Sequence, residues 1–352
     1  MASSECVQVS VIVPARNEEA CLGTCLQSLV AQLGVQFELI VVDDGSTDRT
    51  AEIARSFAGV KVIAAGALPE GWTGKNNAMA AGAKVAEGKW LLFTDADTFH
   101  KPGSLARAVR EAKEQGAALL SYSPKQEVHG FWEKAVMPVI FAELAATFPP
   151  AKVTDPASPI AAANGQYLMI SHQAYDAVGG HTRIAGDLLE DVGMARLVKS
   201  SGRKLFFRYG GDAVRTRMYR NFAQMKEGWT KNLALLFERP RELAFRRAAE
   251  FLVILVSVLL GFGLLLRHID YGLVFLSTGV IASAWSWRRI RQAHFSSGSN
   301  LIALAGLAIF SYLLLRSIAM QRGGVTWKGR KYQGVRKETI ESLDTKSAGR
   351  FA

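Results

Sequence analysis

The stretch Trp90-Leu91-Leu92-Phe93-Thr94-Asp95-Ala96-Asp97 is an apolar run that ends in two aspartates one residue apart. Such a run predicts a buried strand, with both carboxylates at its carboxyl end, the edge at which open α/β sheets bind ligands. Two neighbouring carboxylates repel each other unless a cation neutralises them, and hard oxygen ligands suit Mg²⁺ or Mn²⁺. Because these metals often bind together with phosphates, Asp95 and Asp97 predict a metal–diphosphate site. A solvated turn is the alternative interpretation.

Four further apolar runs indicate the fold around this stretch. The expected strands cover residues 9–15, 37–44, 60–65, 90–97 and 117–124, and most are rich in β-branched residues, which is typical of strands buried on both faces. Helical periodicity between the first two, after a possible N-cap at Asn17, predicts strand–helix–strand units. Short connections of this kind predict a mostly parallel sheet with helices on both faces. No Gly-x-Gly-x-x-Gly follows the first strand, which disfavours a dinucleotide-binding domain.

The charge of the chain is divided unevenly. Residues 1–200 hold 17 Lys/Arg and 22 Asp/Glu, a net charge of −5, whereas residues 201–352 hold 25 and 9, a net charge of +16. In the second half the basic residues flank apolar segments at roughly 251–266, 271–287 and 301–320, each close to the ~20 residues that cross a bilayer. The pattern predicts a membrane region rather than a nucleic-acid-binding face.

Three polar motifs follow predicted strands or precede a predicted helix. They are Pro14-Ala15-Arg16-Asn17-Glu18, Val41-Val42-Asp43-Asp44-Gly45-Ser46-Thr47-Asp48 and Gly71-Trp72-Thr73-Gly74-Lys75-Asn76. All three are expected at the sheet edge that carries Asp95 and Asp97. A lysine at a helix N-terminus adds its charge to the backbone dipole and suits a phosphate.

Taken together, residues 8–235 resemble the family 2 glycosyltransferases, inverting enzymes of the GT-A fold that use nucleotide sugars. The resemblance implies that Pro14, Arg16, Glu18 and Asp44 hold the base and ribose, with Arg16 where an aromatic residue is common. It also implies that Lys75 and Asp95 contact the donor and that Asp95 and Asp97 form the metal motif, with Asp97 the direct ligand of Mg²⁺ or Mn²⁺.

The resemblance extends to the residues that would act on the acceptor. Leu188-Leu189-Glu190-Asp191 matches a Glu-Asp motif whose aspartate is the general base, which an inverting transfer to a hydroxyl group needs. A helix start is the alternative interpretation of Glu190 and Asp191. Further acceptor or sugar contacts are expected from the segment Asn164-Gly165-Gln166 and from Gln224 and Trp229.

The segment Gln224-Met225-Lys226-Glu227-Gly228-Trp229 departs from the Gln-x-x-Arg-Trp motif of processive polysaccharide synthases. The departure favours a single sugar transfer over long-chain synthesis. The whole layout is similar to bacterial hopanoid- and carotenoid-associated glycosyltransferases, which implies a lipid acceptor of the isoprenoid type. Transfer to a polyprenyl phosphate or a glycan is one alternative, and a non-catalytic scaffold that binds nucleotide sugars is another.

The expected domains are a cytosolic catalytic domain at 1–237, a membrane region at 238–322 and a basic tail at 323–352. Met1–Gln8 has no positive residue and no long apolar run, so no secretory signal is expected there. We therefore expect a multi-pass protein of the cell membrane whose apolar segments present the acceptor to a cytosolic site. Three complete crossings would separate the basic tail from that site, a conflict that the sequence leaves open.

Overall fold

A seven-stranded sheet forms the centre of the protein, whose computed structural model describes residues 7–323, 325–327 and 330–332. In order across the sheet, the strands are β3 (Val60–Ala64), β2 (Phe37–Asp43), β1 (Val9–Ala15), β4 (Trp90–Phe93), β8 (Leu168–Ser171), β6 (Leu119–Ser123) and β9 (Leu205–Tyr209). β8 runs antiparallel to both neighbours, and the other pairs are parallel. The predicted α/β fold with a mostly parallel sheet is confirmed.

The five predicted strands are all present, but two local predictions are wrong. β4 ends at Phe93, so Asp95 and Asp97 lie in the loop beyond the strand rather than in it. Asn17 is not a helix cap: it adopts φ 52°, its side chain accepts a hydrogen bond from Thr47 N (2.8 Å), and the helix begins only at Leu22. The polar Asn17 side chain thus joins the loops after β1 and β2.

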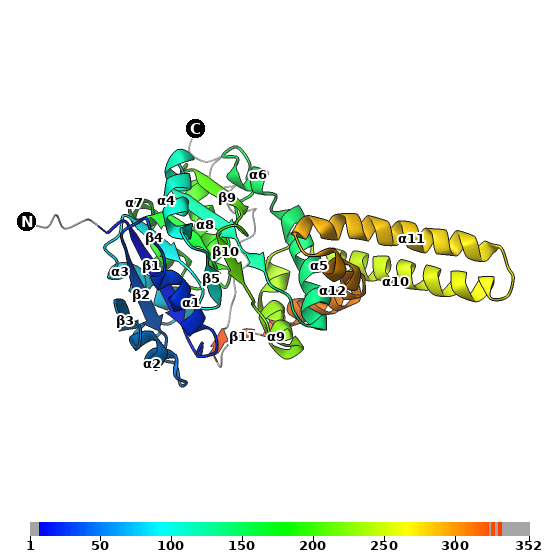
Figure 1. Cartoon of the computed structure of the whole chain (residues 1–352), viewed down its shortest axis with the longest axis horizontal. Coiled ribbons are helices and arrows are strands. Elements are labelled where there is room, and N and C mark those ends of the chain that lie inside the picture. The colour runs from blue at the N-terminus through cyan, green and yellow to red at the C-terminus, as the bar shows by residue number, and fades with distance from the viewer. Residues whose placement is uncertain (1–6, 324, 328–329, 333–352) are drawn as a thin grey trace, which may run out of the picture.

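Helices cover both faces of the sheet (Figure 1), because the strands place apolar side chains alternately on each side. One face carries α1 (Leu22–Val30), α2 (Thr50–Arg55) and α4 (Ser104–Glu114). The other carries α3 (Gly74–Lys84), α6 (Pro150–Thr154), α7 (His172–Ala177) and α8 (Glu190–Ser200). Short 3₁₀ turns occupy Gly180–Ile184 (η1), Leu233–Leu235 (η2) and Arg291–Ala293 (η3).

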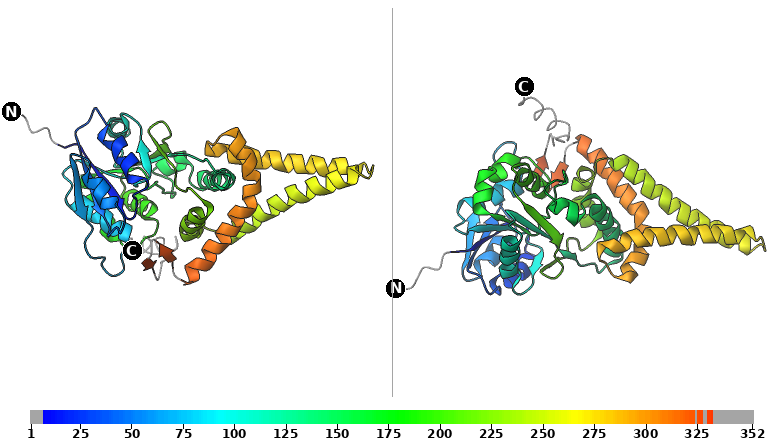
Figure 2. Two further views of the ribbon diagram at one scale, coloured as in Figure 1. Left: turned by 60° about the horizontal axis from the view of Figure 1, so that its bottom comes forward. Right: turned by 90° about the horizontal axis from the view of Figure 1, so that it is seen from above.

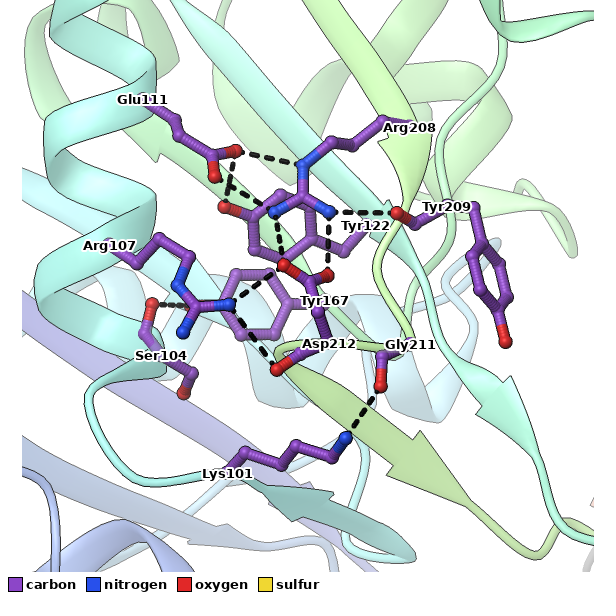
Figure 3. Close-up of polar contacts among 10 residues, drawn as sticks. All are labelled: Lys101, Ser104, Arg107, Glu111, Tyr122, Tyr167, Arg208, Tyr209, Gly211 and Asp212. Atoms are coloured by element: carbon purple, nitrogen blue, oxygen red, sulfur yellow. Dashed lines mark hydrogen bonds and ion pairs between the residues drawn. The ribbon is translucent and has the colours of Figure 1, made fainter.

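A smaller sheet of β5 (Thr98–His100), β10 (Val214–Thr216) and β7 (Lys125–Gln126) lies beyond the end of β4. Its central strand, β10, is joined to β9 by a loop that a network of polar contacts holds in place (Figure 3). Arg208 pairs with Glu111 (2.9 Å) and with Asp212 of the loop (2.7 Å), and Arg107 binds the same aspartate (2.7 Å). These contacts fix the direction in which β10 leaves the main sheet.

Four longer helices of the carboxy-terminal part pack together with one helix from the middle of the chain, α5 (Phe131–Thr147). The four are α9 (Phe222–Asn232), α10 (Pro240–Leu265), α11 (Tyr271–Ile290) and α12 (Ser297–Gly323). α10 and α11 pair as a long hairpin that projects away from the sheets, and α12 lies across its base against α5 and α9 (Figures 1 and 2). Beyond α12, β11 (Val325–Trp327) and β12 (Arg330–Tyr332) form an antiparallel pair. The rest of the expected basic tail lies outside the described residues.

The described part of the chain holds two helices that are long and apolar enough to cross a membrane, Pro240–Leu265 and Ser297–Gln321. By length and composition, the middle one of the three predicted segments is therefore not among these candidate spans. Residues 271–287 do form a helix, α11, but its serine, threonine and glycine residues and the neighbouring Arg288 and Arg289 lower its hydropathy. α11 nonetheless packs along α10, where Gly261 and Gly272 let the two backbones approach closely.

Four charged side chains connect the base of the hairpin to α5. Arg247 of α10 binds Glu143 of α5 (2.7 Å) and Glu250 (2.8 Å), and Arg289 of α11 binds the same two carboxylates (3.3 and 3.1 Å). We call Glu143, Arg247, Glu250 and Arg289 the hairpin clamp. All four are 6–15% exposed, and the charges are balanced two against two.

Candidate active site

The loops after β1, β2 and β4 meet at one edge of the sheet because these strands are parallel neighbours, with Ala15 opposite Asp43 and Ile12 opposite Phe93. They border a cavity of about 740 Å³, closed on its other side by β10, the segment 217–220 and α9. Of the predicted site residues, the cavity is lined by Pro14, Arg16, Glu18, Asp44, Lys75, Asp95, Asp97, Gln166, Glu190 and Gln224.

Arg16 and Asp44 connect the first two loops at one end of the cavity. Arg16 donates from Nη1 to the backbone oxygen of Asp44 (3.1 Å), and its guanidinium lies 3.8 Å from the Asp44 carboxylate. The backbone N–H of Glu18 donates to Thr50 Oγ1 (2.8 Å), which ties the first loop to the start of α2. The planar guanidinium of Arg16 and the buried Asp44 side chain thus form a polar surface that suits a nucleoside.

Lys75 bridges two acidic side chains in the middle of the cavity. It lies in the first turn of α3, which Thr73 caps by accepting from Asn76 N (3.2 Å). Its Nζ lies 2.7 Å from Asp95 Oδ1 and 2.6 Å from Glu190 Oε1. The two carboxylates raise the pKa of Lys75, and the ammonium lowers the pKa of Glu190, although burial opposes both shifts. One ammonium therefore bridges two carboxylates that are far apart in the sequence, and the three groups together keep a net negative charge.

Asp97 stands in the loop between β4 and β5, and its backbone oxygen accepts from Thr216 Oγ1 of β10 (3.1 Å). In the part of the chain that the structure describes, no group of three or more His, Cys, Asp and Glu residues could hold a metal by itself. Mg²⁺ is commonly held by one or two carboxylates together with substrate phosphates and water. Asp95 and Asp97 fit that mode, and both line the cavity.

Asp191 follows Glu190 at the start of α8 and, unlike Glu190, is not among the residues that line the cavity. Its two carboxylate oxygens accept from the backbone N–H groups of Gly165 (2.9 Å) and Val192 (2.8 Å). Burial, and secondly the charge of Glu190, raise the pKa of Asp191 to about 7, while Lys75 and the backbone donors oppose the shift. A carboxyl group with this pKa exchanges its proton near neutral pH, as a general base must.

The segment around Gly165 shapes the site from behind. A Cβ at Gly165 would lie 3.2 Å from Glu190 Oε1 and 3.3 Å from Lys75 Nζ, so the glycine allows the Lys75 bridge to form. Asn164 does not line the cavity: its side chain accepts from Gln166 N (2.9 Å) and shapes the turn. Gln166 is buried and donates to Thr216 Oγ1 (3.2 Å), which in turn holds the Asp97 loop.

α9 presents one face to the cavity and the opposite face to the protein interior. Gln224, Glu227, Gly228 and Lys231 line the cavity, as expected for residues at helical spacing. Trp229 does not: it is 5% exposed and donates its indole N–H to Met137 Sδ of α5 (3.4 Å). The prediction that Trp229 contacts the acceptor is therefore inconsistent with its position, because burial among the helices stabilises its large ring there instead.

Sequence reasoning missed Lys231 and Tyr219. Burial lowers the pKa of Lys231 to about 8, even though Glu190, Asp95 and Asp191 act in the opposite direction. Its backbone oxygen accepts from Gln321 of α12 (2.8 Å). The spacing of Gln224, Gly228 and Lys231 on one helical face was the signal that could have indicated this lysine.

Comparison with known proteins agrees with this geometry. Residues 10–169, which contain the Arg16, Asp44, Lys75 and Asp95–Asp97 loops, match the model of glycosyl transferase family 2. The chain carries a family 2 glycosyltransferase domain. It is 26% identical over 341 residues to the 4,4'-diaponeurosporenoate glycosyltransferase of Staphylococcus aureus strain MRSA252, which covers 92% of this chain and 88% of that protein. The same enzyme from strain USA300 is 27% identical over 342 residues, with the same coverage.

A solved mannosyltransferase from Pyrobaculum calidifontis, in complex with GDP-Man and Mn²⁺, shares the fold of the family 2 domain and of much of the rest. The TM-score is 0.51 at 16% sequence identity, over 90% of this chain and 87% of that one. The chain is thus a glycosyltransferase with a GT-A-type α/β domain, as its motifs predict. Glu190, Asp191 and α9 lie beyond the residues that the family model matches.

Proposed function

We propose that this glycosyltransferase is bound to the membrane and transfers one sugar, with inversion, from a nucleotide sugar to a lipid acceptor of the isoprenoid type. The observation that carries the proposal is the position of the Lys75–Glu190–Asp191 cluster. It lies between the nucleotide-side loops and α9, the helix that packs against the apolar carboxy-terminal helices. Donor and acceptor can therefore approach the cluster from opposite sides.

On the donor side, Arg16, Glu18 and Asp44 would hold the nucleoside, and Lys75 would contact the diphosphate. Asp97, with Asp95, would hold Mg²⁺ or Mn²⁺, which neutralises the charge of a leaving diphosphate when bound. The relative solved with GDP-Man and Mn²⁺ shares only the fold, so the choice of nucleotide and metal rests on the side chains of this cavity.

On the acceptor side, Asp191 would take the proton of a hydroxyl group while its oxygen bonds to the anomeric carbon and the bond to the diphosphate breaks. The pKa of about 7 suits this role. The relatives are named for diaponeurosporenoate, a name that denotes a carboxylate. A carboxylate acceptor arrives without its proton and would need Asp191 less.

The hairpin of α10 and α11 is proposed to enter the bilayer. Large apolar side chains along both helices are exposed, for example Leu259 (63%), Phe262 (61%), Val274 (63%) and Ile281 (69%). The apolar part of each arm is roughly 24–25 Å long at 1.5 Å per residue, slightly less than the ~30 Å of an average hydrocarbon core. The tip holds Arg267, His268 and Asp270, which would then lie at the far headgroups.

This arrangement removes the conflict over the basic tail. A hairpin crosses twice, and α12 returns along its base, where Ser317 Oγ accepts from Ala234 N (3.0 Å) and Gln321 contacts Lys231. The end of α12 is thus on the catalytic side, with Arg239, Arg241 and Arg291 placed to meet anionic headgroups. α12 would lie along the membrane surface rather than cross it.

The function is tested with the full chain in lipid nanodiscs, given a panel of nucleotide sugars and isoprenoid alcohols and acids, with lipid products weighed by mass spectrometry. We expect one sugar on one lipid class and no product with excess chelator. Asp97→Asn should abolish transfer and metal-dependent nucleotide binding, while Glu114→Gln, at an exposed ion pair on α4, should leave both intact. Nucleotide-sugar binding without a lipid product from any acceptor would contradict the proposal.

The topology is tested with Ile269→Cys at the hairpin tip and Glu238→Cys before α10, labelled by a membrane-impermeant maleimide, with the parent protein as the blank for its own cysteines. In vesicles that expose the catalytic domain, Glu238→Cys should react at once and Ile269→Cys only after the bilayer is permeabilised. Equal labelling of both positions in sealed vesicles would rule out a hairpin that crosses the membrane.

A further inference from the structure

Gly228 of α9 is in direct contact with the ring of Tyr219. A Cβ at Gly228 would meet the Tyr219 hydroxyl oxygen first and would lie 2.5 Å from Cε1 and 2.8 Å from Cζ of the ring, distances at which the Tyr219 side chain would have to move. The ring also contacts Trp229, with the two ring centroids 6.1 Å apart, and packs against the apolar cluster that α5, α9 and α12 form. Only glycine at position 228 therefore leaves Tyr219 where it is.

This contact explains the departure from Gln-x-x-Arg-Trp in physical terms. Gly228 directly precedes Trp229 and so takes the place of the arginine in that motif. Trp229 itself is buried against α5, which orients α9 with Gly228 facing the cavity. The space that a long cationic side chain would enter is filled instead by an aromatic ring from the preceding loop.

Tyr219 also faces the predicted metal carboxylates. It lines the same cavity as Asp95 and Asp97, and burial together with these two charges raises the pKa of its hydroxyl well above the usual range. The hydroxyl therefore stays protonated under all ordinary conditions. Its neighbour Arg220 donates to the backbone oxygen of Ala20 (3.2 Å), which joins the loop of Tyr219 to the loop after β1. The Tyr219 ring thus forms part of the cavity lining, together with Asp95, Asp97 and α9.

We propose that Tyr219, seated on Gly228, closes the α9 side of the cavity so that an acceptor already carrying a sugar is excluded. The inference rests on the proposed function and gives a physical reason why only one sugar is transferred to each lipid. A bare lipid head reaches Glu190 and Asp191 past the ring, whereas a sugar-bearing head needs the volume that the ring occupies. Tyr219 is in this sense a specificity-determining residue, and its bulk matters more than its hydroxyl.

The test compares Tyr219→Ala with Tyr219→Phe in the full chain in nanodiscs, using the bare lipid and its one-sugar product as acceptors. The wild-type protein and Tyr219→Phe should add one sugar and leave the one-sugar lipid unchanged. Tyr219→Ala should use the one-sugar lipid, with a rate that rises by about tenfold or more, the scale on which pocket volume discriminates substrates. Nucleotide binding should be the same in all three proteins.

Two outcomes would overturn the inference. One is a Tyr219→Ala protein that turns over the bare lipid but rejects the one-sugar lipid as the wild type does. The other is a Tyr219→Phe protein that accepts it, which would assign the exclusion to the hydroxyl. If Tyr219→Ala does not fold, Tyr219→Leu, which also removes the ring, should likewise use the one-sugar lipid. If the wild type glycosylates no lipid at all, the proposed function fails instead, so the two failures are distinguishable.

Discussion

Two clusters of charged side chains lie inside this protein, and they differ in balance and access. In the hairpin clamp, Arg247 and Arg289 face Glu143 and Glu250, and every one of these side chains is at most 15% exposed. In the active-site cluster, Lys75 faces Asp95 and Glu190, with Asp191 behind them, and Lys75 and Asp95 are 32% and 29% exposed beside the cavity. The first cluster is a closed set, and the second has excess negative charge next to an open space.

The difference separates a structural cluster from a ligand site. A set of charges that is balanced and largely shielded from water leaves no net charge for a ligand to neutralise, and it mainly fixes the geometry of the helices that carry it. A set with excess carboxylates and access to a cavity is completed by a cation and by the groups that arrive with it. Changes in the first cluster should therefore act on stability, and changes in the second on catalysis.

The largest effect is expected from Asp191→Asn. With a hydroxyl acceptor, turnover should fall by ~10²–10⁴, the usual loss when a positioned base is removed. Nucleotide-sugar affinity should remain, because Asp191 contacts only backbone donors and the neighbouring cluster. Single-turnover rates and nucleotide titration of the same preparation measure the two quantities.

The prediction for Asp191→Asn can be tested further by comparing a carboxylate acceptor with a hydroxyl acceptor. Because such an acceptor needs no deprotonation, the loss in Asp191→Asn should be clearly smaller with an isoprenoid acid than with the matching alcohol. If Asp191→Asn turns over the alcohol at the normal rate, Asp191 is not the general base, and Glu190 and Asp191 only begin a helix.

The next effect concerns the clamp. Glu143→Gln removes the carboxylate that Arg247 and Arg289 share, and breaking a buried ion pair typically lowers the free energy of unfolding by ~3–5 kcal/mol. Glu114→Gln is the control, because its ion pair with Arg110 is 61–64% exposed and such pairs contribute ~0–1 kcal/mol. Thermal unfolding in one detergent compares them.

The Glu143 and Glu114 variants are also compared by their rates of sugar transfer. Glu143→Gln should transfer sugar at the wild-type rate per folded molecule, since the clamp does not line the cavity. Equal stability of the Glu143 and Glu114 variants would show that the clamp does not hold the hairpin to α5.

The smallest effect is a dependence on pH. The folded pKa of Asp191, about 7, lies above its value in the unfolded chain, so the folded state holds the proton more tightly. The stability that this group contributes is present below an unfolded pKa of ~3.9 and is lost as the pH rises through the folded value. The unfolding free energy of the wild type, relative to Asp191→Asn, should therefore fall between about pH 4 and pH 7. The rate with an alcohol acceptor should rise over the same interval, so a flat difference in stability would contradict the raised pKa.

Much of the sheet and of the donor side followed from the sequence, because both depend on neighbours along the chain. Apolar runs with β-branched residues form strands wherever both faces are covered, and parallel strands bring the residues that follow them to one edge. Arg16, Asp44, Asp95 and Asp97 could be placed together for that reason alone. The helix start at Lys75 was equally readable, since Thr73 caps the helix locally.

Local patterns failed where a residue can satisfy two environments. Trp229 is amphipathic and fits a cavity wall or a core equally well, and only the packing of α5 against α9 decides for the core. The middle apolar segment has a composition between that of a soluble and a membrane helix. It packs against α10 because Gly261 and Gly272 let the two backbones approach closely, and local hydropathy does not reveal such a contact.

The sequence by itself thus determined the α/β sheet, its acidic edge and the presence of long apolar helices. The tertiary structure decided that Lys75 reaches Glu190, that Tyr219 lies on Gly228, and that α10 and α11 form a hairpin whose clamp holds α5. Strand and helix formation depend on periodicity within a few turns. Side-chain pairing between different elements depends instead on how the finished elements pack, because burial fixes which charges and rings must meet.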